Sequence, residues 1–255
     1  MGLMEYDFDQ RPLVYVAGPY ASPDPVENTH NAIQVADRLN ASGVVTAVKS
    51  VVPGKNADVI EQAARLWLKD TDRVLDMTFG KGAFWKKYRP YHLVEGDLNP
   101  TKGDGFDFRA RPEPDETFDV VVLDPPYVSQ GGRKTSTIPD FTDAYGLDDA
   151  PGTADEIDEL VYDGMQEAKR LLVPNGFLFV KTMDYITSGK FHQGHQRVVD
   201  SAWGMGLEQV DEFVHVSGTG PQPTKNLDGS PRRQVHSRRA HSFLCIFQKP
   251  KLRGG

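Results

Sequence analysis

The sequence has a single cysteine and no long hydrophobic run. Cys245 lies within the apolar run SFLCIF, and one cysteine permits neither a disulfide framework nor a cysteine zinc site. No apolar run approaches the roughly eighteen residues that a membrane span requires. Residues 1–10 are acidic rather than basic and apolar, so we expect no export signal. These absences predict a cytoplasmic protein without a membrane partner.

The chain also lacks an overall positive charge. Its 255 residues carry a formal net charge of −7, which argues against a protein that coats nucleic acid by bulk attraction. The charge is unevenly distributed, because residues 140–163 hold nine acids and no Lys or Arg. Residues 225–241 hold one acid, Asp228, and the basic residues Lys225, Arg232, Arg233, Arg238 and Arg239. A polyanion therefore has one region where it could bind.

Apolar runs of strand length alternate with segments of helical spacing. Helices are predicted over residues 56–69 (with Asn56 as a possible N-cap), 154–172 and 191–205, and strands over 73–79, 92–98, 118–124 and 176–183. Consecutive apolar residues, as in 120–123, suit strands that are covered on both faces. We therefore expect an α/β fold with a doubly wound, mostly parallel sheet, closed by an antiparallel hairpin of 207–217 and 242–249. The intervening polar loop, 217–242, is too long for a minimal turn and is either functional or mobile.

Ligands of open α/β sheets bind beyond the carboxyl ends of the strands. At the first such end, in LDMTFGKGAFW, Asp76 closes a strand, and Gly80 and Gly82 allow a tight turn that brings backbone close to a ligand. At the second, in HLVEGDLNP, Asp97 stands where an acid can hold the hydroxyls of a ribose. Taken singly, each stretch is also explained as an ordinary turn.

A third stretch, GDGFDF, adds an acid and an aromatic ring. The Asp107 carboxylate could accept from an adenine amino group, and the Phe108 ring could pack on the base, although a polar turn explains the stretch better in isolation. Together the three stretches predict a crevice shaped for adenosine. There is no Walker lysine pattern, so ATP and GTP are disfavoured as ligands.

The stretch Asp124-Pro125-Pro126-Tyr127 directly follows the apolar run 120–123. The two prolines fix φ and remove backbone donors, so the turn displays only acceptors. Such a turn fits an exocyclic amino group of a nucleobase, whose two N–H bonds could be held between the Asp124 carboxylate and the Pro125 carbonyl. Tyr127 would stack on a base drawn out of its helix. A proline turn that merely ends a strand does not account for the flanking acid and aromatic residue.

The motif DPPY, with LDxTFGxGxFW upstream of it, resembles the S-adenosylmethionine-dependent amino-methyltransferases of DNA, which methylate adenine N6 or cytosine N4. The resemblance covers residues 56–249 and implies a Rossmann-like methyltransferase domain over 51–255 with S-adenosylmethionine as cofactor and no metal. It implies that Asp124, Pro125, Pro126 and Tyr127 are catalytic. It implies cofactor contacts from Asp76, Thr78, Phe79, Gly80, Gly82, Asp97, Asp107 and Phe108.

The polymer and the base are less defined. An aspartate at the start of the motif is commoner in the adenine branch, so the resemblance favours adenine N6 in DNA, while cytosine N4 and RNA stay open. No large separate target-recognition domain is evident, so sequence specificity could be short or absent. Loop residues expected to contact the phosphate backbone are Arg133, Lys134, Lys225, Arg232, Arg233, Arg238 and Arg239.

Residues 13–45 raise a separate question. A predicted strand ending in Gly18-Pro19-Tyr20, followed by an amphipathic helix, resembles the start of nucleoside 2-deoxyribosyltransferases. The resemblance ends near Val45, so residues 1–50 are interpreted as a truncated extension, either a remnant or a docking element. Two other functions stay open, namely glycosyl exchange on free deoxynucleosides and non-catalytic binding of nucleic acid. The oligomeric state is not predicted.

Overall fold

The computed structural model describes residues 7–8, 11–12, 47–125, 151, 153–217, 230 and 233–251. The chain divides into two compact units, Met1–Val48 and Lys49–Gly255. In the first unit the described strands are β1 (Asp7–Phe8) and β2 (Arg11–Pro12), which pair antiparallel. Residues 13–45 lie outside the described residues, so their resemblance to a deoxyribosyltransferase stays a prediction.

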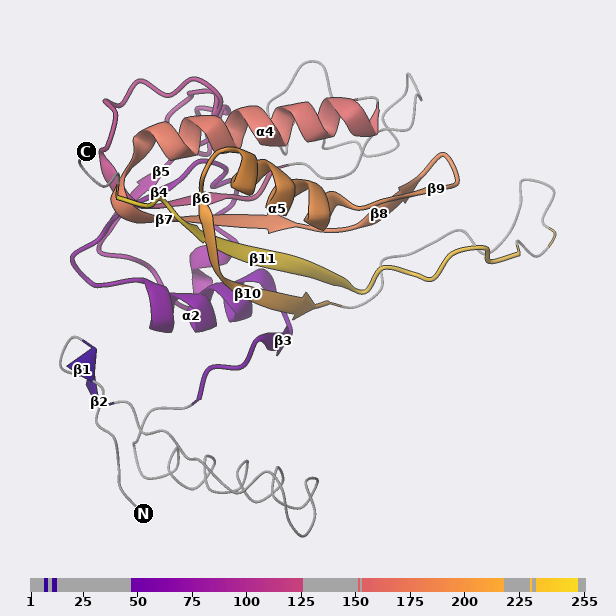
Figure 1. The fold of residues 1–255 in the computed structure, drawn as a ribbon, viewed down its shortest axis with the longest axis horizontal. Coiled ribbons are helices and arrows are strands. Elements are labelled where there is room, and N and C mark those ends of the chain that lie inside the picture. The colour runs from indigo at the N-terminus through magenta and orange to yellow at the C-terminus, as the bar shows by residue number, and fades with distance from the viewer. Residues whose placement is uncertain are drawn as a thin grey trace, which may run out of the picture. The chain divides into compact units, whose positions relative to one another are not determined.

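A seven-stranded sheet with the order β3-β10-β11-β7-β6-β4-β5 forms the centre of the second unit (Figure 1). Strands β5, β4, β6 and β7 are parallel, and β11 joins β7 and β10 by antiparallel pairing. The predicted doubly wound sheet with an antiparallel terminal hairpin is thus confirmed. The strands are β3 (Val51–Pro53), β4 (Arg73–Asp76), β5 (His92–Glu95), β6 (Phe118–Leu123), β7 (Leu172–Thr182), β10 (Glu208–Val216) and β11 (His241–Gln248).

Helices cover both faces of the sheet. Figure 1 shows α4 (Ala154–Leu171) and α5 (Gly194–Gly204) on one face and α2 (Asn56–Trp67) on the other, and the short 3-10 helix η1 (Phe84–Lys86) follows β4. This arrangement explains why β6 is buried over nearly its whole length. Within the described residues, no helix is long and apolar enough to cross a membrane.

The two helix starts show how side chains set the boundaries. Thr153 caps α4, because its hydroxyl accepts from the Glu156 N–H at 3.2 Å. The proposed N-cap of the first helix is wrong by one residue, since the N-cap of α2 is Lys55, whose backbone N–H donates to the Asp58 carboxylate at 2.6 Å. The Asn56 side chain is instead an acceptor for the Lys181 ammonium, at 3.0 Å.

A small hairpin beyond β7 was not expected from the sequence. Strand β8 (Tyr185–Thr187) pairs antiparallel with β9 (Lys190–His192) through a two-residue turn. Both turn residues, Ser188 and Gly189, have positive φ, as such a turn requires. The helix predicted near 191–205 is confirmed, but it begins at Gly194, because residues 190–192 belong to β9.

The register of the parallel strands aligns their carboxyl ends. Asp76 pairs with Glu95, and Leu123 pairs with Val180, so the carboxyl ends of β4, β5, β6 and β7 meet at one edge of the sheet. This edge carries Asp76, Asp97, Asp124 and Lys181.

Candidate functional site

A pocket of about 680 Å³ opens at the carboxyl edge of the parallel strands. Its volume lies in the range of small-molecule and cofactor sites. The loops after β4, β5 and β6 supply its walls. The lining residues are Asp76, Met77, Thr78, Phe79, Gly80, Lys81, Ala83, Phe84, Asp97, Leu98, Asn99, Thr101, Lys102, Phe108 and Asp124. Six of the eight predicted cofactor residues therefore lie around one pocket, together with the predicted catalytic Asp124.

The loop after β4 is a tight turn organised by Asp76. This buried carboxylate accepts from the Thr78 N–H at 3.0 Å through Oδ1 and from the Trp85 indole at 2.7 Å through Oδ2. Gly80 and Gly82 both have positive φ. A Cβ on Gly82 would lie 2.8 Å from the Phe79 ring, so Gly82 shapes the turn from behind, although it does not line the pocket.

Asp97 joins the first loop to the second. Its Oδ2 accepts from the Gly80 N–H and its Oδ1 from the Asn99 N–H, both at 2.8 Å. Asp97 is 5% exposed. A carboxylate offers about four acceptor positions, so two remain available to a ligand with neighbouring hydroxyl groups.

The structure separates the two residues predicted to contact adenine. Phe108 lines the pocket and packs so closely on α4 that a Cβ on Gly164 would lie 2.7 Å from its ring. Asp107 is absent from the lining, and its carboxylate accepts from Arg109 Nε at 3.0 Å and Nη2 at 2.6 Å. The adenine contact proposed for Asp107 stays a prediction.

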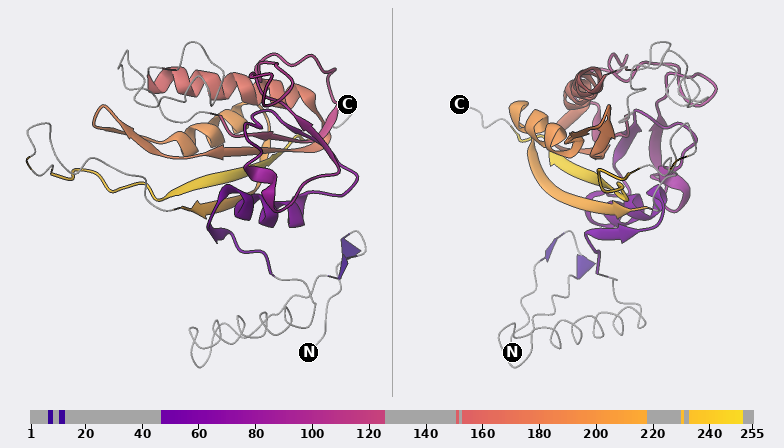
Figure 2. Two further views of the ribbon diagram at one scale, coloured as in Figure 1. Left: turned by 180° about the vertical axis from the view of Figure 1, so that it is seen from behind. Right: turned by 90° about the vertical axis from the view of Figure 1, so that its right-hand side faces the viewer.

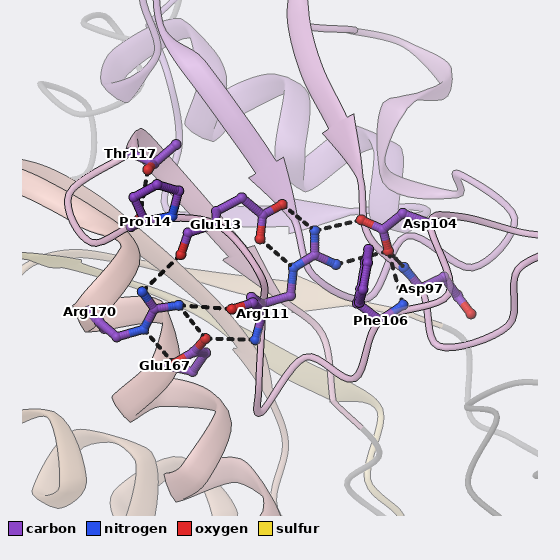
Figure 3. Close-up of polar contacts among 9 residues, drawn as sticks. All are labelled: Asp97, Asp104, Phe106, Arg111, Glu113, Pro114, Thr117, Glu167 and Arg170. Carbon is purple, nitrogen blue, oxygen red and sulfur yellow. Dashed lines mark hydrogen bonds and ion pairs between the residues drawn. The ribbon is translucent and has the colours of Figure 1, made fainter.

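A buried arginine holds the segment that carries these residues (Figure 3). The Arg111 side chain has 0% exposure, and its guanidinium donates to Asp104 at 2.9 and 2.5 Å and to Glu113 at 3.1 and 2.6 Å. Burial alone would raise the pKa of Asp104, but the Arg111 hydrogen bonds and charge outweigh it and the pKa is lowered. Asp104 is thus held as a carboxylate against the guanidinium.

The same segment is tied to neighbouring elements. The Asp104 carboxylate also lies 3.4 Å from the Asp97 N–H, and a Cβ on Gly96 would lie 2.8 Å from Arg111 Nη1. At its other end, Glu167 of α4 accepts from the Arg111 N–H at 2.7 Å. Arg111 therefore positions the Asp97 loop against the sheet and α4.

Asp124 differs from the other acids of the pocket in one respect. The residue as a whole is partly exposed, but its Oδ1 atom is buried and has no hydrogen-bond partner within the described residues. Its backbone N–H donates to Thr78 Oγ1 at 2.7 Å, which fixes the strand end. Burial raises the pKa of Asp124 to about 6, and the positive charge of Lys181 opposes part of that rise. The pocket wall thus presents an acceptor in need of a donor.

The interior of the pocket favours a cation. Burial raises the pKa of Asp76 to about 7, even though the hydrogen bonds from Trp85 and Thr78 oppose the rise, and the nearby Asp124 adds to it. A positively charged group bound beside these two acids would offset their mutual repulsion. The pocket's lysines, Lys81 and Lys102, are not buried.

Sequence reasoning missed three supporting residues. Lys181 lies at the end of β7, beside Asp124, with its ammonium 5.9 Å from the Phe84 ring centre. Burial lowers the pKa of Lys181, and the Asp124 charge opposes that effect. Its place at a parallel-strand end was the available signal. Trp85 ends the motif LDMTFGKGAFW that begins beside its partner Asp76, so the motif itself was the signal. Arg111 had no comparable signal, because it stands in a polar stretch outside any motif.

The remaining predicted residues lie elsewhere or outside the described residues. Pro125 is buried directly after Asp124, whereas Pro126, Tyr127, Arg133, Lys134, Lys225 and Arg232 lie outside the described residues. Arg233, Arg238 and Arg239 belong to the extended segment that leads into β11. Their proposed contacts with nucleic acid stay predictions.

One grouping away from the pocket contains metal-ligating residue types. His195, Glu212 and Cys245 bring their donor atoms within 4.8 Å of one another, which the spacing of the histidines did not indicate. His195 Nε2 lies 2.7 Å from Glu212 Oε2, and its ring stacks on Phe243 at 4.0 Å. These contacts account for the position of His195 without an ion.

Comparison with known proteins gives only distant similarities. No family model matches the chain, and no curated protein matches it. Among solved structures it is similar to a candidate DNA modification methylase from Thermus thermophilus, with 15% identity and a TM-score of 0.36 over 56% of this chain and 51% of that one. The same protein has been solved with S-adenosylmethionine bound.

Two further structures show the same level of similarity. The PvuII DNA methyltransferase, which is cytosine-N4-specific, has 17% identity and a TM-score of 0.37 over 55% of this chain and 46% of that one. A SAM-dependent methyltransferase from Methanosarcina mazei has 13% identity and a TM-score of 0.45 over 74% and 97%. The chain thus spans about half the length of the two DNA methylases. Similarity at this level assigns neither a family nor a substrate to the chain.

Proposed function

We propose that residues 51–255 transfer a methyl group from S-adenosylmethionine to an exocyclic amino group of a base in DNA, with adenine N6 as the favoured target. One observation carries the proposal. Asp124 presents a buried carboxylate oxygen without a donor among the described residues, at the wall of a pocket that also contains Asp76 and Asp97. An acceptor in that state fits a substrate that brings N–H bonds.

The residues of the pocket fit the cofactor. Asp97 retains two acceptor positions for ribose hydroxyls, Phe108 offers a ring for the adenine, and Asp76 is a buried acid suited to an ammonium group. When bound, S-adenosylmethionine supplies an electrophilic methyl group on a positively charged sulfur. The raised pKa values of Asp76 and Asp124, together with Asp97, make this a site where a cation is favoured.

Asp124 would act on the amino group. Accepting one of its N–H bonds draws the nitrogen towards tetrahedral geometry and makes its lone pair available. The nitrogen forms a bond to the methyl carbon, the electron pair of the carbon–sulfur bond stays on sulfur, and one amino proton then leaves to solvent. A carboxylate is needed for this role, so transfer should weaken below pH about 6, where Asp124 takes up a proton.

The choice of base and polymer has separate support. The resemblance of DPPY to the adenine branch favours N6, while cytosine N4 offers the same two N–H bonds and stays the alternative base. The exposed Arg233 and Arg238 support a polyanionic substrate. RNA is the alternative polymer. Deoxyribosyl transfer has no observation in its favour, because residues 13–45 lie outside the described residues.

The test combines one substitution with product analysis. We expect wild-type protein to produce N6-methyladenine in DNA, detected by mass spectrometry of nucleosides, and Asp124→Ala to lose at least about 100-fold in kcat. Cofactor affinity measured by calorimetry should fall far less than kcat, because Asp124 acts mainly in the transition state and Asp76 and Asp97 still line the pocket.

Asp119→Ala is the matched control. Asp119 lies at the amino end of the same strand, where it accepts from the Arg73 N–H at 2.9 Å, and its loss should leave the rate of transfer unchanged. An undiminished rate in Asp124→Ala would refute the proposed site. N4-methylcytosine as product would overturn the base, and methylated RNA beside unmethylated DNA would overturn the polymer. DNA binding without transfer by the wild type would indicate a non-catalytic protein.

A further inference from the structure

Two segments far apart in the sequence pack together beyond the end of β7. One is the β8–β9 hairpin, residues 185–192, and the other is residues 233–240, which lead into β11; we call the pair the basic arm. The Arg239 guanidinium lies 4.9 Å from the centre of the Phe191 ring, and His236 Nε2 lies 3.0 Å from the Gly189 carbonyl oxygen. These contacts join the tip of the hairpin to the loop, so the two segments form one structure.

The basic arm carries positive charge without any acid. Its residues include Lys190, Arg233, Arg238 and Arg239 but no Asp or Glu, in a chain with a formal net charge of −7. Lys190, Arg233 and Arg238 are exposed, and within the described residues they form no ion pair. An exposed and unpaired group of cations provides a surface complementary to a polyanion.

Phe191 and Arg239 have a different place in the basic arm. The Phe191 side chain is exposed at 43% even though Arg239 lies over its ring. Arg239 is only partly exposed, and its Nη2 donates to Ser237 Oγ at 2.5 Å. Arg239 therefore holds the loop on the hairpin, which leaves the other three cations to contact a ligand.

The topology places the basic arm at the edge of the sheet that contains Asp124. Leu123 pairs with Val180, and Thr182 pairs with Phe243. The same end of the sheet therefore carries Asp124, the start of β8 and the start of β11. Figures 1 and 2 show the hairpin and the segment before β11 projecting from that same end. A polymer lying along the basic arm would thus reach the edge where the pocket opens.

We infer that the basic arm is the surface that binds the phosphate backbone of duplex DNA beside the target base. The inference rests on the proposed function and deepens it, because it assigns substrate binding to the β8–β9 hairpin together with the loop before β11. Lys190, Arg233 and Arg238 contact phosphates. Arg239 and Phe191 are positioning residues that keep the two segments together.

The test measures binding directly and does not depend on methylation. Fluorescence anisotropy with a short labelled DNA duplex gives the affinity of the full chain over a series of salt concentrations. For the variant Lys190→Ala/Arg233→Ala/Arg238→Ala we expect affinity to fall about 10- to 100-fold. The slope of log affinity against log salt should become less steep by about 3, because each of the three cations neutralises one phosphate in the wild type.

Arg238→Ala and Arg73→Ala form a matched pair. Arg73 is an exposed arginine that lies over a phenylalanine ring, Phe118, and forms no acidic pair within the described residues, but it stands at the amino end of β4. Both changes remove one positive charge. Only Arg238 belongs to the basic arm, so only Arg238→Ala should alter the slope of log affinity against log salt. Calorimetry with S-adenosylhomocysteine should show unchanged cofactor affinity in all variants, which verifies that the pocket is intact.

The outcomes separate the basic arm from the methyl transfer. An unchanged salt slope in the triple variant, or an equal effect of Arg73→Ala, would overturn the basic arm even if the wild type methylates DNA. A reduced slope in the triple variant would support it even if no methyl transfer occurred, and the proposed function alone would then fail. Tighter binding of an RNA of the same sequence would overturn the assignment to DNA.

Discussion

The arginines of the sheet body and those of the basic arm differ in their partners. Outside the basic arm, the structure describes the side chains of seven arginines, and six of these form an ion pair with Asp or Glu, whereas none of the three within it does. Arg111 is the extreme of the first group, since it is fully buried between two carboxylates. Arg238 is typical of the second, exposed and without an acidic partner among the described residues.

This difference separates two uses of the same side chain. A buried guanidinium fixes the geometry of a loop through its fork of donors, because any displacement would leave charges without partners. An exposed guanidinium without partners fixes nothing within the chain and is available for a phosphate. In this protein the buried Arg111 shapes the pocket that is proposed to bind the cofactor, and the exposed arginines of the basic arm are proposed to hold the polymer.

The largest effect should come from Arg111→Met. Removal of one partner from a buried ion pair costs about 3–5 kcal/mol. Asp104 and Glu113 keep side-chain exposures of 27% and 20%, so solvation of the two acids brings our expectation to the lower end, about 3 kcal/mol in the free energy of unfolding. Chemical denaturation of the free protein measures this value. Arg238→Met should change the free energy of unfolding by less than about 0.5 kcal/mol. Similar losses of stability in the two variants would show that Arg111 and Arg238 do not differ in structural role.

Asp97 lies where the Arg111 network meets the pocket, so it tests whether that network serves the cofactor. Asp97→Ala removes a charge-assisted acceptor, and we expect a loss of about 1.5–3 kcal/mol in binding free energy, or roughly ten- to a hundredfold in affinity. Asp119→Ala is the control, because Asp119 lies at the amino end of β6, where its carboxylate accepts from the Arg73 N–H at 2.9 Å. Calorimetry that showed equal losses for the two variants would place the ribose elsewhere.

The sheet and the acids of the pocket could be predicted from the sequence. Unbroken apolar runs such as 120–123 are typical of strands buried on both faces, and an acid directly after such a strand must lie at its carboxyl end. Asp76, Asp97 and Asp124 were placed correctly at one edge for this reason. Their meeting in one pocket needs only parallel strands in register, which βαβ connections enforce.

Features that depend on tertiary contacts could not be predicted. Arg111 stands in a polar stretch, and its burial follows from the folding of Asp104 and Glu113 around it rather than from any local pattern. The hairpin 185–192 has only three residues in each strand, too few for an alternating pattern, and its sequence YITSGKFH places Ser-Gly at the turn without other signals. The edge strand Val51–Pro53 is equally short.

The acids of the pocket give a pH dependence that the basic arm should not share. Asp76 has a pKa raised by burial to about 7, so it gains a proton as the pH falls below 7 and loses its attraction for a cationic cofactor. We expect cofactor affinity to fall by up to about tenfold for each pH unit below 7. Stability of the free protein should change the other way, because the folded state binds this proton more tightly than the unfolded state between pH 3.8 and about 7.

Calorimetric titrations with the cofactor across this pH range test the predicted fall in affinity. Chemical denaturation of the free protein over the same range tests the predicted gain in stability. Asp76→Asn should flatten the pH dependence of cofactor binding, while the salt slope of DNA binding should be unaltered by this substitution. Cofactor affinity that stays constant as the pH falls from about 8 to about 5 would show that Asp76 does not bind the positively charged part of the cofactor.

The smallest expected effect concerns the joint between the two segments of the basic arm. If Arg239 and Phe191 act together to position the cations, Phe191→Ala and Arg239→Ala should each weaken DNA binding, and the double variant should lose less than the sum of the single losses. The coupling energy should be about 0.5–1 kcal/mol, the size of an exposed cation–π contact. Phe191→Tyr keeps a ring under the Arg239 guanidinium, so this variant should bind DNA nearly as tightly as the wild type. Phe191→Ala and Phe191→Tyr carry the same charge, so a difference between them would be due to the ring. Phe191→Ala combined with Arg73→Ala is the reference pair, for which the losses should add. Additive losses in the first pair would mean that hairpin and loop bind DNA independently, and the distinction between positioning and contacting residues in the basic arm would have to be abandoned.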